Sequence, residues 1–285
     1  MKCIKMLPRG EICLAENRAI GVFDSGLGGL TVVSELSRYL PNEDIVYFGD
    51  TGRVPYGTRS KETIRKYALE DEAFLIEKDV KLIIAACGTV SSVAYDTAET
   101  LPVPFFEVVS HAAFDAARTT KNGKIGVLGT AATVNSGMHE KFIKEVLPEA
   151  EVTARACSMF VSLVEEGWLA DDDIVVLETA RRYLKPIIEA KCDTVILGCT
   201  HFPVLKGAIK SILGDKVTLI DAGTATAKAV KEFLVKNGLN ADSEKVAMNK
   251  YYVSDKAYSF KKTATVLLGK KIEDEDIKQV NLNSL

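Results

Sequence analysis

Residues 81–89 read KLIIAACGT, an apolar run that ends in Cys87 and continues into two small residues. A second segment, TVILGCTHF at residues 194–202, repeats this pattern and contains Cys199. Strands that are apolar throughout are typical of parallel sheets covered by helices on both faces. Because ligands bind at the carboxyl ends of such strands, both cysteines are predicted to lie where a ligand would bind.

The rest of the chain alternates apolar runs with segments of helical spacing, and this order begins again near the middle. In the first half we expect strands at 19–23, 44–48, 81–86 and 105–109, with helices at 30–40 and 61–78. In the second half we expect strands at 124–128, 151–156, 194–197 and 217–220, with helices at 134–147, 171–189 and 224–236. The pattern predicts an α/β protein of two similar domains, each a mostly parallel sheet flanked by helices, with the active site in the cleft between them.

This repeat also suggests where the domains begin and end. We expect an N-terminal extension (1–18), a first domain (19–111 with 222–270), a second domain (112–221) and a C-terminal tail (271–285). The extension is interrupted by charges and is expected to be poorly ordered. The acidic run at 273–276 indicates a solvated tail.

Composition excludes several classes of protein. The 285 residues contain 36 Lys and Arg against 39 Asp and Glu, and 47% of them are hydrophobic, as in an ordinary globular protein. No stretch is strongly basic, which argues against a nucleic-acid partner. No apolar run suits a membrane helix or an export signal. We therefore expect a cytoplasmic protein, free of nucleic acid and membrane. Its six cysteines are expected to be free thiols, because disulfides are rare in a chain of this size without an export signal, and no C-x-x-C pair occurs.

Cys87 and Cys199 are the residues best suited to chemistry. Small residues after Cys87 suit a helix N-terminus, an environment that would lower the pKa of a thiol from about 8.5. His201 follows Cys199 by two residues, and an imidazole can take or share a thiol proton. Taken singly, each cysteine suits a buried core position, but two strand-end cysteines in a repeat favour catalysis. A zinc site made of Cys87, Cys199 and His201, as in a hydrolase, is a weaker alternative because no close ligand pair occurs.

Asp24 and Ser25 end the first strand. Asp24 could polarise a thiol and Ser25 could bind a substrate carboxylate, although both are also ordinary turn residues. The following GLGGLT (26–31) resembles a dinucleotide-binding loop but has Thr31 in place of the third glycine, so no nicotinamide cofactor is expected. Glu165, taken alone, fits the solvated end of a helix.

Across about residues 20–268 these motifs resemble those of glutamate racemase, in the aspartate/glutamate racemase family. The matching segments, in order, are GVFDSGLGG (21–29), YFGD (47–50), VPYG (54–57), AC (86–87), GVLGT (126–130) with Thr133, LVE (163–165) and LGCTHFP (197–203). The resemblance implies a cofactor-independent isomerase that interconverts L- and D-glutamate and binds no metal. It also implies a cytoplasmic homodimer that supplies D-glutamate for peptidoglycan synthesis, and so for cell wall biogenesis and cell shape.

The resemblance assigns roles to individual residues. Cys87 and Cys199 match the two acid–base thiols, of which one removes the α-proton while the other donates a proton to the opposite face. Asp24 matches the partner of Cys87, and His201 with Glu165 matches the partners of Cys199. The positions that match those holding the substrate are Asp24, Ser25, Pro55, Tyr56, Gly57, Gly88, Thr89, Thr130, Thr133, Thr200 and His201.

The sequence departs from the family pattern at a few positions. Gly88 stands where the family usually has Asn directly after the first cysteine, so that side-chain contact must be lost or supplied by another group. Ser158 and Ser162 replace the usual prolines near Cys157. Aspartate or another small acidic amino acid is therefore the nearest alternative substrate. A non-catalytic ligand-binding homologue is the alternative outside the enzyme class.

Overall fold

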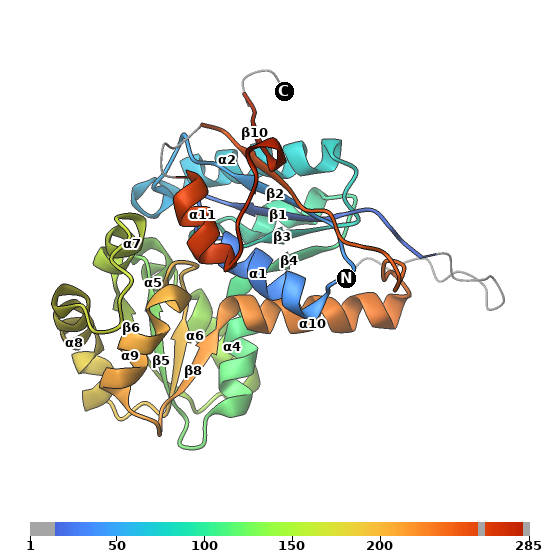
Figure 1. Ribbon diagram of the computed structural model, residues 1–285. Coiled ribbons are helices and arrows are strands. Elements are labelled where there is room, and N and C mark those ends of the chain that lie inside the picture. Colours follow the sequence, from blue (N-terminus) through green and yellow to red (C-terminus); the bar gives the residue numbers. More distant parts are fainter. Residues whose placement is uncertain (1–14, 256–259, 282–285) are drawn as a thin grey trace.

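The structure is a computed structural model that describes residues 15–255 and 260–281. These residues form two parallel sheets, each flanked by helices, which lie one above the other in Figure 1. The first sheet has the order β10-β9-β2-β1-β3-β4, and the second β6-β5-β7-β8. The strands of the first sheet are β1 (Ile20–Asp24), β2 (Ile45–Gly49), β3 (Leu82–Ala85), β4 (Phe105–Glu107), β9 (Lys250–Val253) and β10 (Ile277–Gln279); those of the second are β5 (Lys124–Gly129), β6 (Glu151–Ala156), β7 (Thr194–Leu197) and β8 (Thr218–Asp221). The predicted fold class is confirmed.

Helices cover both sheets and join them. The helices are α1 (Leu30–Tyr39), α2 (Lys61–Glu77), α3 (Gly88–Val93), α4 (Val108–Thr119), α5 (Ala131–Asn135), α6 (Met138–Val146), α7 (Ser158–Glu165), α8 (Ile174–Glu189), α9 (Lys206–Leu213), α10 (Ala222–Asn237) and α11 (Phe260–Leu268), with short 3₁₀ turns η1 (Tyr56–Thr58), η2 (Tyr95–Thr100), η3 (Phe202–Leu205) and η4 (Asp274–Asp276). Helices α4 and α10 pack on each other and contact elements of both halves, α10 touching β4 and β8.

Alternation along the strands explains why the central strands are apolar at every position. On β1, Ile20 and Val22 belong to a core cluster that extends into the second sheet, whereas Phe23 belongs to a separate cluster under α2. Phe48 of β2 and Phe74 of α2 are in the same cluster as Phe23, and their ring centroids are 4.7 Å apart. Successive side chains of a strand point to opposite faces, so a strand buried on both faces must be apolar throughout. The cluster shared by both sheets places the two halves firmly against each other.

Two predicted helices differ from the observed ones for local reasons. The helix expected at 134–147 is divided into α5 and α6, because Gly137 adopts a left-handed conformation with φ of 67°. The helix expected from 171 begins only at Ile174. Its cap is Asp173, whose side chain accepts hydrogen bonds from the N–H groups of Val175 and Val176.

The chain ends are better ordered than predicted where they are described. Residues 1–14 of the expected extension lie outside the described residues. Glu16 forms two backbone hydrogen bonds with the rest of the protein: its N–H donates to the carbonyl of Asn240, and its carbonyl accepts from Lys81 Nζ. In the predicted solvated tail, Ile277–Gln279 instead forms β10 and pairs with β9. This strand lies at the sheet edge, where a polar segment can pair through its backbone and leave side chains in water.

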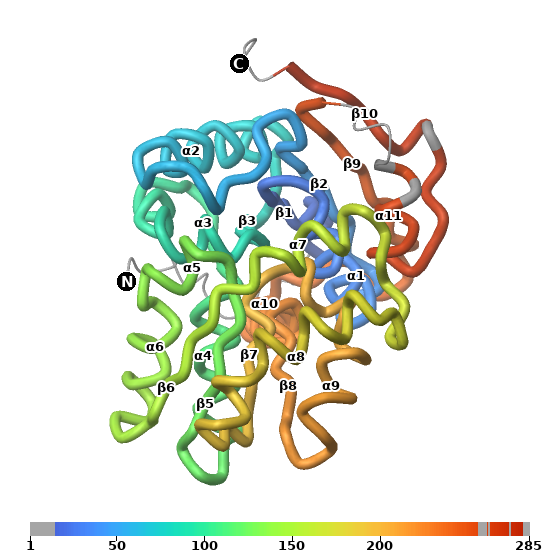
Figure 2. The backbone as a smooth tube through the Cα atoms, turned by 90° about the vertical axis from the view of Figure 1, so that its left-hand side faces the viewer, coloured from blue at the N-terminus to red at the C-terminus, as the bar shows by residue number. Residues whose placement is uncertain are grey.

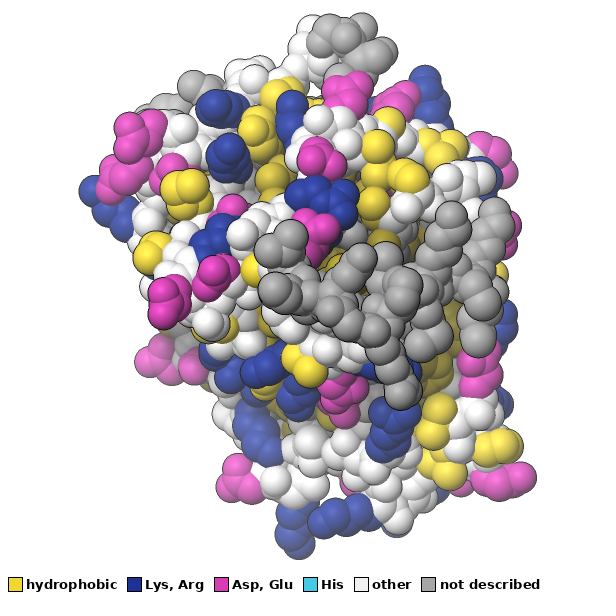
Figure 3. Space-filling model, turned by 90° about the vertical axis from the view of Figure 1, so that its right-hand side faces the viewer, with side chains coloured by type: hydrophobic (Ala, Val, Ile, Leu, Met, Phe, Trp, Pro, Cys, Tyr) yellow, Lys and Arg dark blue, Asp and Glu magenta, His cyan; other side chains and the backbone are white. Residues whose placement is uncertain are grey.

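The surface agrees with the nearly balanced charge of the chain. On the face shown in Figure 3, Lys and Arg side chains are interspersed with Asp and Glu. Within residues 15–255 and 260–281, no helix combines the length and the apolar character needed to cross a membrane.

Candidate active site

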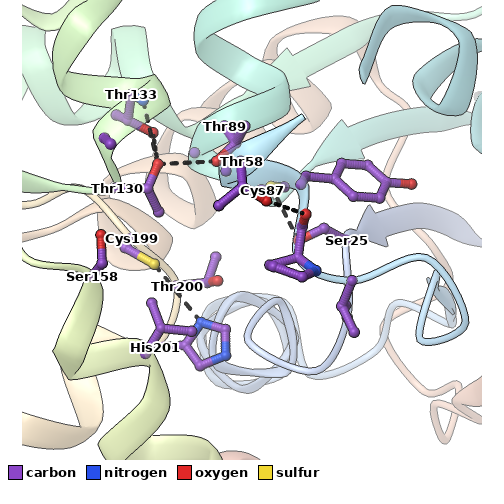
Figure 4. Close-up of a pocket in the computed structure, with 18 of the residues that line it drawn as sticks. Ser25, Thr58, Cys87, Thr89, Thr130, Thr133, Ser158, Cys199, Thr200 and His201 are labelled. Carbon is purple, nitrogen blue, oxygen red and sulfur yellow. Dashed lines mark hydrogen bonds between the residues drawn. The ribbon is translucent and has the colours of Figure 1, made fainter. Parts of the chain in front are cut away.

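A cavity of about 320 Å³ lies between the two halves, where loops at the carboxyl ends of β1, β3, β5 and β7 meet. Cys87 and Cys199 both line it, as Figure 4 shows. Its wall consists of Ser25, Gly26, Val54, Pro55, Tyr56, Gly57, Thr58, Cys87, Gly88, Thr89, Thr130, Ala131, Thr133, Ser158, Val161, Ser162, Glu165, Gly198, Cys199, Thr200 and His201. Every site residue predicted from the sequence is therefore at this cavity, except Asp24.

Cys87 is the N-cap residue of α3 and is buried. Its Sγ donates to Ser25 Oγ at 3.4 Å. Burial, with a further contribution from the charge of Asp24, raises the pKa of the Cys87 thiol to about 12. The expectation that a helix N-terminus would lower this pKa was wrong, because loss of solvation outweighs the hydrogen bonds that favour the thiolate. Without a substrate, Cys87 holds its proton.

Cys199 has a different environment. His201 Nδ1 lies 3.7 Å from Cys199 Sγ, and His201 Nε2 lies 3.3 Å from Glu165 Oε1 in an ion-pair contact. Burial opposes a charge on the imidazole, but its contacts with Cys199 and Glu165 outweigh burial and raise the pKa of His201 to about 10. An imidazolium beside a sulfur favours the thiolate. The two thiols of one cavity thus have different neighbours, with Ser25 and Asp24 near Cys87 and His201 near Cys199.

Asp24 lies behind the cavity and does not line it. Its side chain is buried, and its Oδ2 accepts the N–H of Gly26 at 3.0 Å. Burial raises the pKa of Asp24, against the opposing effect of His201. When ionised, Asp24 favours the protonated forms of both Cys87 and His201. The structure thus gives Asp24 an electrostatic relation to Cys87 and to His201, whereas the sequence related it to Cys87 alone.

Three threonine hydroxyls form a row along the cavity, running from Thr89 in the first half to Thr130 and Thr133 in the second (Figure 4). Thr89 Oγ1 is 3.1 Å from Thr130 Oγ1, which is 3.0 Å from Thr133 Oγ1. These hydroxyls can rotate to donate to a substrate carboxylate. Tyr56 also lines the cavity, but its hydroxyl is hydrogen-bonded to the buried carboxyl groups of Asp50 and Asp71. Only the rest of Tyr56 is available to the cavity.

Glycine allows the two halves to approach closely beside the thiols. A Cβ atom added to Gly88 would lie 2.4 Å from the carbonyl oxygen of Gly198. An Asn at position 88 would therefore require the backbone of Gly88 or Gly198 to shift. In the glycine-rich loop, a Cβ on Gly28 would lie 2.2 Å from Thr200 Oγ1, and Thr31 Oγ1 donates to the carbonyl of Thr200. The loop that resembled a dinucleotide motif joins the two halves.

Several wall residues were not predicted as site residues. They are Gly26, Val54, Thr58, Ala131, Ser158, Val161, Ser162 and Gly198. The replacement of the family's usual prolines by Ser158 and Ser162 was the sequence feature that could have indicated α7, which forms one side of the cavity. Cys87, Cys157, Cys192 and Cys199 are free, and Cys3 and Cys13 lie outside the described residues. In the described part of the chain, no group of three or more His, Cys, Asp or Glu residues is arranged to hold a metal ion.

Comparison with known proteins gives consistent matches. The sequence model of the Asp/Glu/hydantoin racemase family matches residues 20–230. A glutamate racemase of Geobacter metallireducens is 44% identical over 268 residues, which are 94% of this chain and 98% of that protein. The crystal structure of glutamate racemase from Francisella tularensis in complex with D-glutamate has a TM-score of 0.86 and 37% identity, covering 95% of this chain and all of that one. The enzyme from Thermus thermophilus in complex with β-chloro-D-alanine has a TM-score of 0.84, 41% identity and the same coverage.

Proposed function

The chain belongs to the Asp/Glu/hydantoin racemase family, and we propose that it interconverts L- and D-glutamate without a cofactor, using Cys87 and Cys199 as its two bases. The observation that carries this proposal is the position of both thiols on the wall of one cavity, among hydroxyl groups. Relatives named glutamate racemase at 37–44% identity over nearly the whole chain support glutamate as the substrate.

The reaction follows from the difference between the thiols. The Cys199 thiolate, stabilised by the His201 imidazolium, takes the α-proton from one face of glutamate. Cys87 gives its proton to the opposite face of the carbanion, so the configuration is inverted and Cys87 is left as the thiolate. Proton exchange with solvent then returns Cys199 to the thiolate and Cys87 to the thiol before the same enantiomer reacts again, and the other enantiomer reacts in the reverse direction. Two bases are needed because a single base tends to return the proton to the face from which it came.

The carbanion requires stabilisation where its charge develops. Thr89, Thr130 and Thr133 can donate hydrogen bonds to the α-carboxylate, and so favour negative charge that spreads from the α-carbon. No Lys or Arg is among the residues that line the cavity in the described part of the chain. Neutral donors therefore hold the substrate carboxylates, with Ser25, Thr200 and the backbone of Pro55, Tyr56 and Gly57 completing the wall. Glu165 acts through His201, and Asp24 acts on both Cys87 and His201.

Replacement of each thiol tests the proposal. We expect Cys87→Ser and Cys199→Ser each to lower kcat for glutamate by roughly 10²- to 10⁴-fold, the usual contribution of a general acid or base. Cys192→Ser is the matched control, because Cys192 is also buried but lies away from the cavity. Optical rotation of purified protein with L- or D-glutamate, and with L- or D-aspartate, measures the turnover. Near-normal turnover in both cavity variants would exclude the thiols as the bases. If the wild-type protein racemised aspartate and not glutamate, the proposed substrate would be wrong.

We also propose that the protein acts in the cytoplasm as a homodimer and supplies D-glutamate for peptidoglycan. This part rests on the family resemblance. Light scattering of the purified protein tests the dimer, and a requirement for D-glutamate in cells depleted of the protein tests the role in the cell wall.

A further inference from the structure

Three buried side chains meet behind the loop that forms one wall of the cavity. Tyr56 is 1% exposed, and both Asp50 and Asp71 are fully buried. The Tyr56 hydroxyl forms a short hydrogen bond with Asp50 Oδ2 and lies 3.1 Å from Asp71 Oδ2. Arg53 joins the two carboxyls, with Nε 2.5 Å from Asp50 Oδ2 and a terminal nitrogen 3.0 Å from Asp71 Oδ1.

A count of hydrogens shows that this arrangement needs one more proton than ordinary ionisation supplies. The Tyr56 hydroxyl has a single hydrogen but contacts two carboxyl oxygens. If both carboxyls were ionised, one oxygen would face the phenol oxygen without a hydrogen between them. In a buried site such an unpaired contact is costly. One of the two carboxyls must therefore carry a hydrogen and donate it to Tyr56.

The surrounding groups decide which carboxyl is protonated. Asp50 accepts from Ser254 Oγ at 2.7 Å and from Arg53 Nε, in addition to Tyr56, so its oxygens already face donors. Among the residues that the structure describes, Asp71 Oδ2 hydrogen-bonds only with the Tyr56 hydroxyl. Glu70 also pairs with Arg53 and lies within reach of Lys66 Nζ at 3.8 Å, whereas Asp50 and Asp71 share Arg53 as their cation among the described residues. Burial, and then the charge of Asp50, raise the pKa of Asp71 well above its ordinary value.

We propose that Asp71 is a neutral carboxylic acid that donates to Tyr56, and that the chain Asp71–Tyr56–Asp50 holds the 54–58 loop in place at the substrate cavity. These are positioning residues, and this role rests on the proposed racemase function. The cluster connects the loop to α2 through Asp71 and to the end of β2 through Asp50. On its other side the loop meets the second half of the protein, where a Cβ on Gly57 would lie 3.3 Å from Thr130 Cβ. A loop fixed in this way keeps its backbone ready for the substrate.

Two isosteric variants distinguish the carboxyls. In Asp71→Asn, the amide nitrogen can donate to Tyr56 while the amide oxygen accepts from Arg53, so the hydrogen-bond pattern is preserved. We expect KM and kcat for glutamate to stay within about threefold of the wild type, because no buried group loses its partner. In Asp50→Asn, an amide N–H must face Ser254 or the donors Tyr56 and Arg53. We expect KM to rise roughly tenfold, with a smaller change in kcat, because substrate binding is weakened.

The order of these effects is the test. Equal effects of the two variants, or a larger effect of Asp71→Asn, would overturn the proposal. If Asp50→Asn does not fold, Tyr56→Phe replaces it in the comparison, because it removes the shared hydroxyl and keeps the ring. We expect KM of Tyr56→Phe to rise above that of Asp71→Asn, and the reverse order would again overturn the proposal.

Infrared spectroscopy tests the protonation state without any reaction. The difference spectrum of the wild type and Asp71→Asn at neutral pH should contain the carbonyl stretch of a protonated carboxylic acid, shifted in D₂O. Absence of this band would overturn the proposal whatever the kinetics. A wild-type protein that shows the band but does not racemise glutamate would refute the proposed function and leave the assignment of the proton intact.

Discussion

Gly88→Ala should separate the two halves of the site with the smallest possible change in sequence. The added Cβ would lie 2.4 Å from the carbonyl oxygen of Gly198, and ordinary contact begins at 3.4 Å, so the backbone must move by 1.0 Å. Gly88 directly follows Cys87 and Gly198 directly precedes Cys199, so this movement displaces both thiols. A displacement of about 1 Å in a catalytic arrangement costs roughly 10²-fold in rate. We therefore expect kcat to fall about 100-fold, or about 2.7 kcal/mol in activation free energy.

The assay is the steady-state rate of racemisation from each enantiomer of glutamate, with the thermal unfolding of each variant measured beside it. Gly57→Ala is the comparator, since a Cβ there would lie 3.3 Å from Thr130 Cβ, and Thr130 would need to move by only a few tenths of an ångström. It should lose only a few-fold in kcat, well short of Gly88→Ala. A folded Gly88→Ala protein with nearly normal kcat would show that the close approach does not set the spacing of the thiols.

Two further predictions concern charged groups. Glu165→Gln should move the basic limb of the kcat/KM profile, set by the His201 pKa of about 10, to lower pH, because the lost carboxylate had favoured the imidazolium. Glu165 is 49% exposed, so the shift should stay below about one pH unit. An unchanged basic limb would show that Glu165 does not influence the pKa of His201. Lys81→Met should lower the free energy of unfolding by about 3–5 kcal/mol, because it leaves the buried Glu43 without its cation. Urea titration measures this loss, and Lys144→Ala, from an exposed ion pair, should lose less than about 1 kcal/mol; equal losses would contradict the argument.

The strands and the meeting point of the two halves could be predicted because their signals are local. Segments such as LIIA at 82–85 and TVIL at 194–197 are apolar on both faces, and the observed strands match them. The rule that ligands bind at the carboxyl ends of parallel strands was then enough to place Cys87 and Cys199 at one cavity.

The remaining features depend on contacts between residues far apart in the sequence. Nothing near Gly88 indicates that the carbonyl of Gly198 will lie against it. The high pKa of Cys87 arises from burial and from Asp24, neither of which is visible in the sequence around the cysteine. The direction of the Tyr56 hydroxyl is likewise set by Asp71, which lies on α2. Such contacts decide how a site works after local patterns have decided where it lies.

Incorporation of deuterium at the α-carbon during a brief reaction in D₂O tests the two-thiol account most directly. Starting from L-glutamate, the D-glutamate formed early should carry one deuterium at the α-carbon, while the unreacted L-glutamate still carries protium, and the same should hold in the reverse direction. This asymmetry is expected because one thiol removes the proton and the other supplies a solvent-derived one. Equal early labelling of product and unreacted substrate would indicate a single base, and would contradict the account.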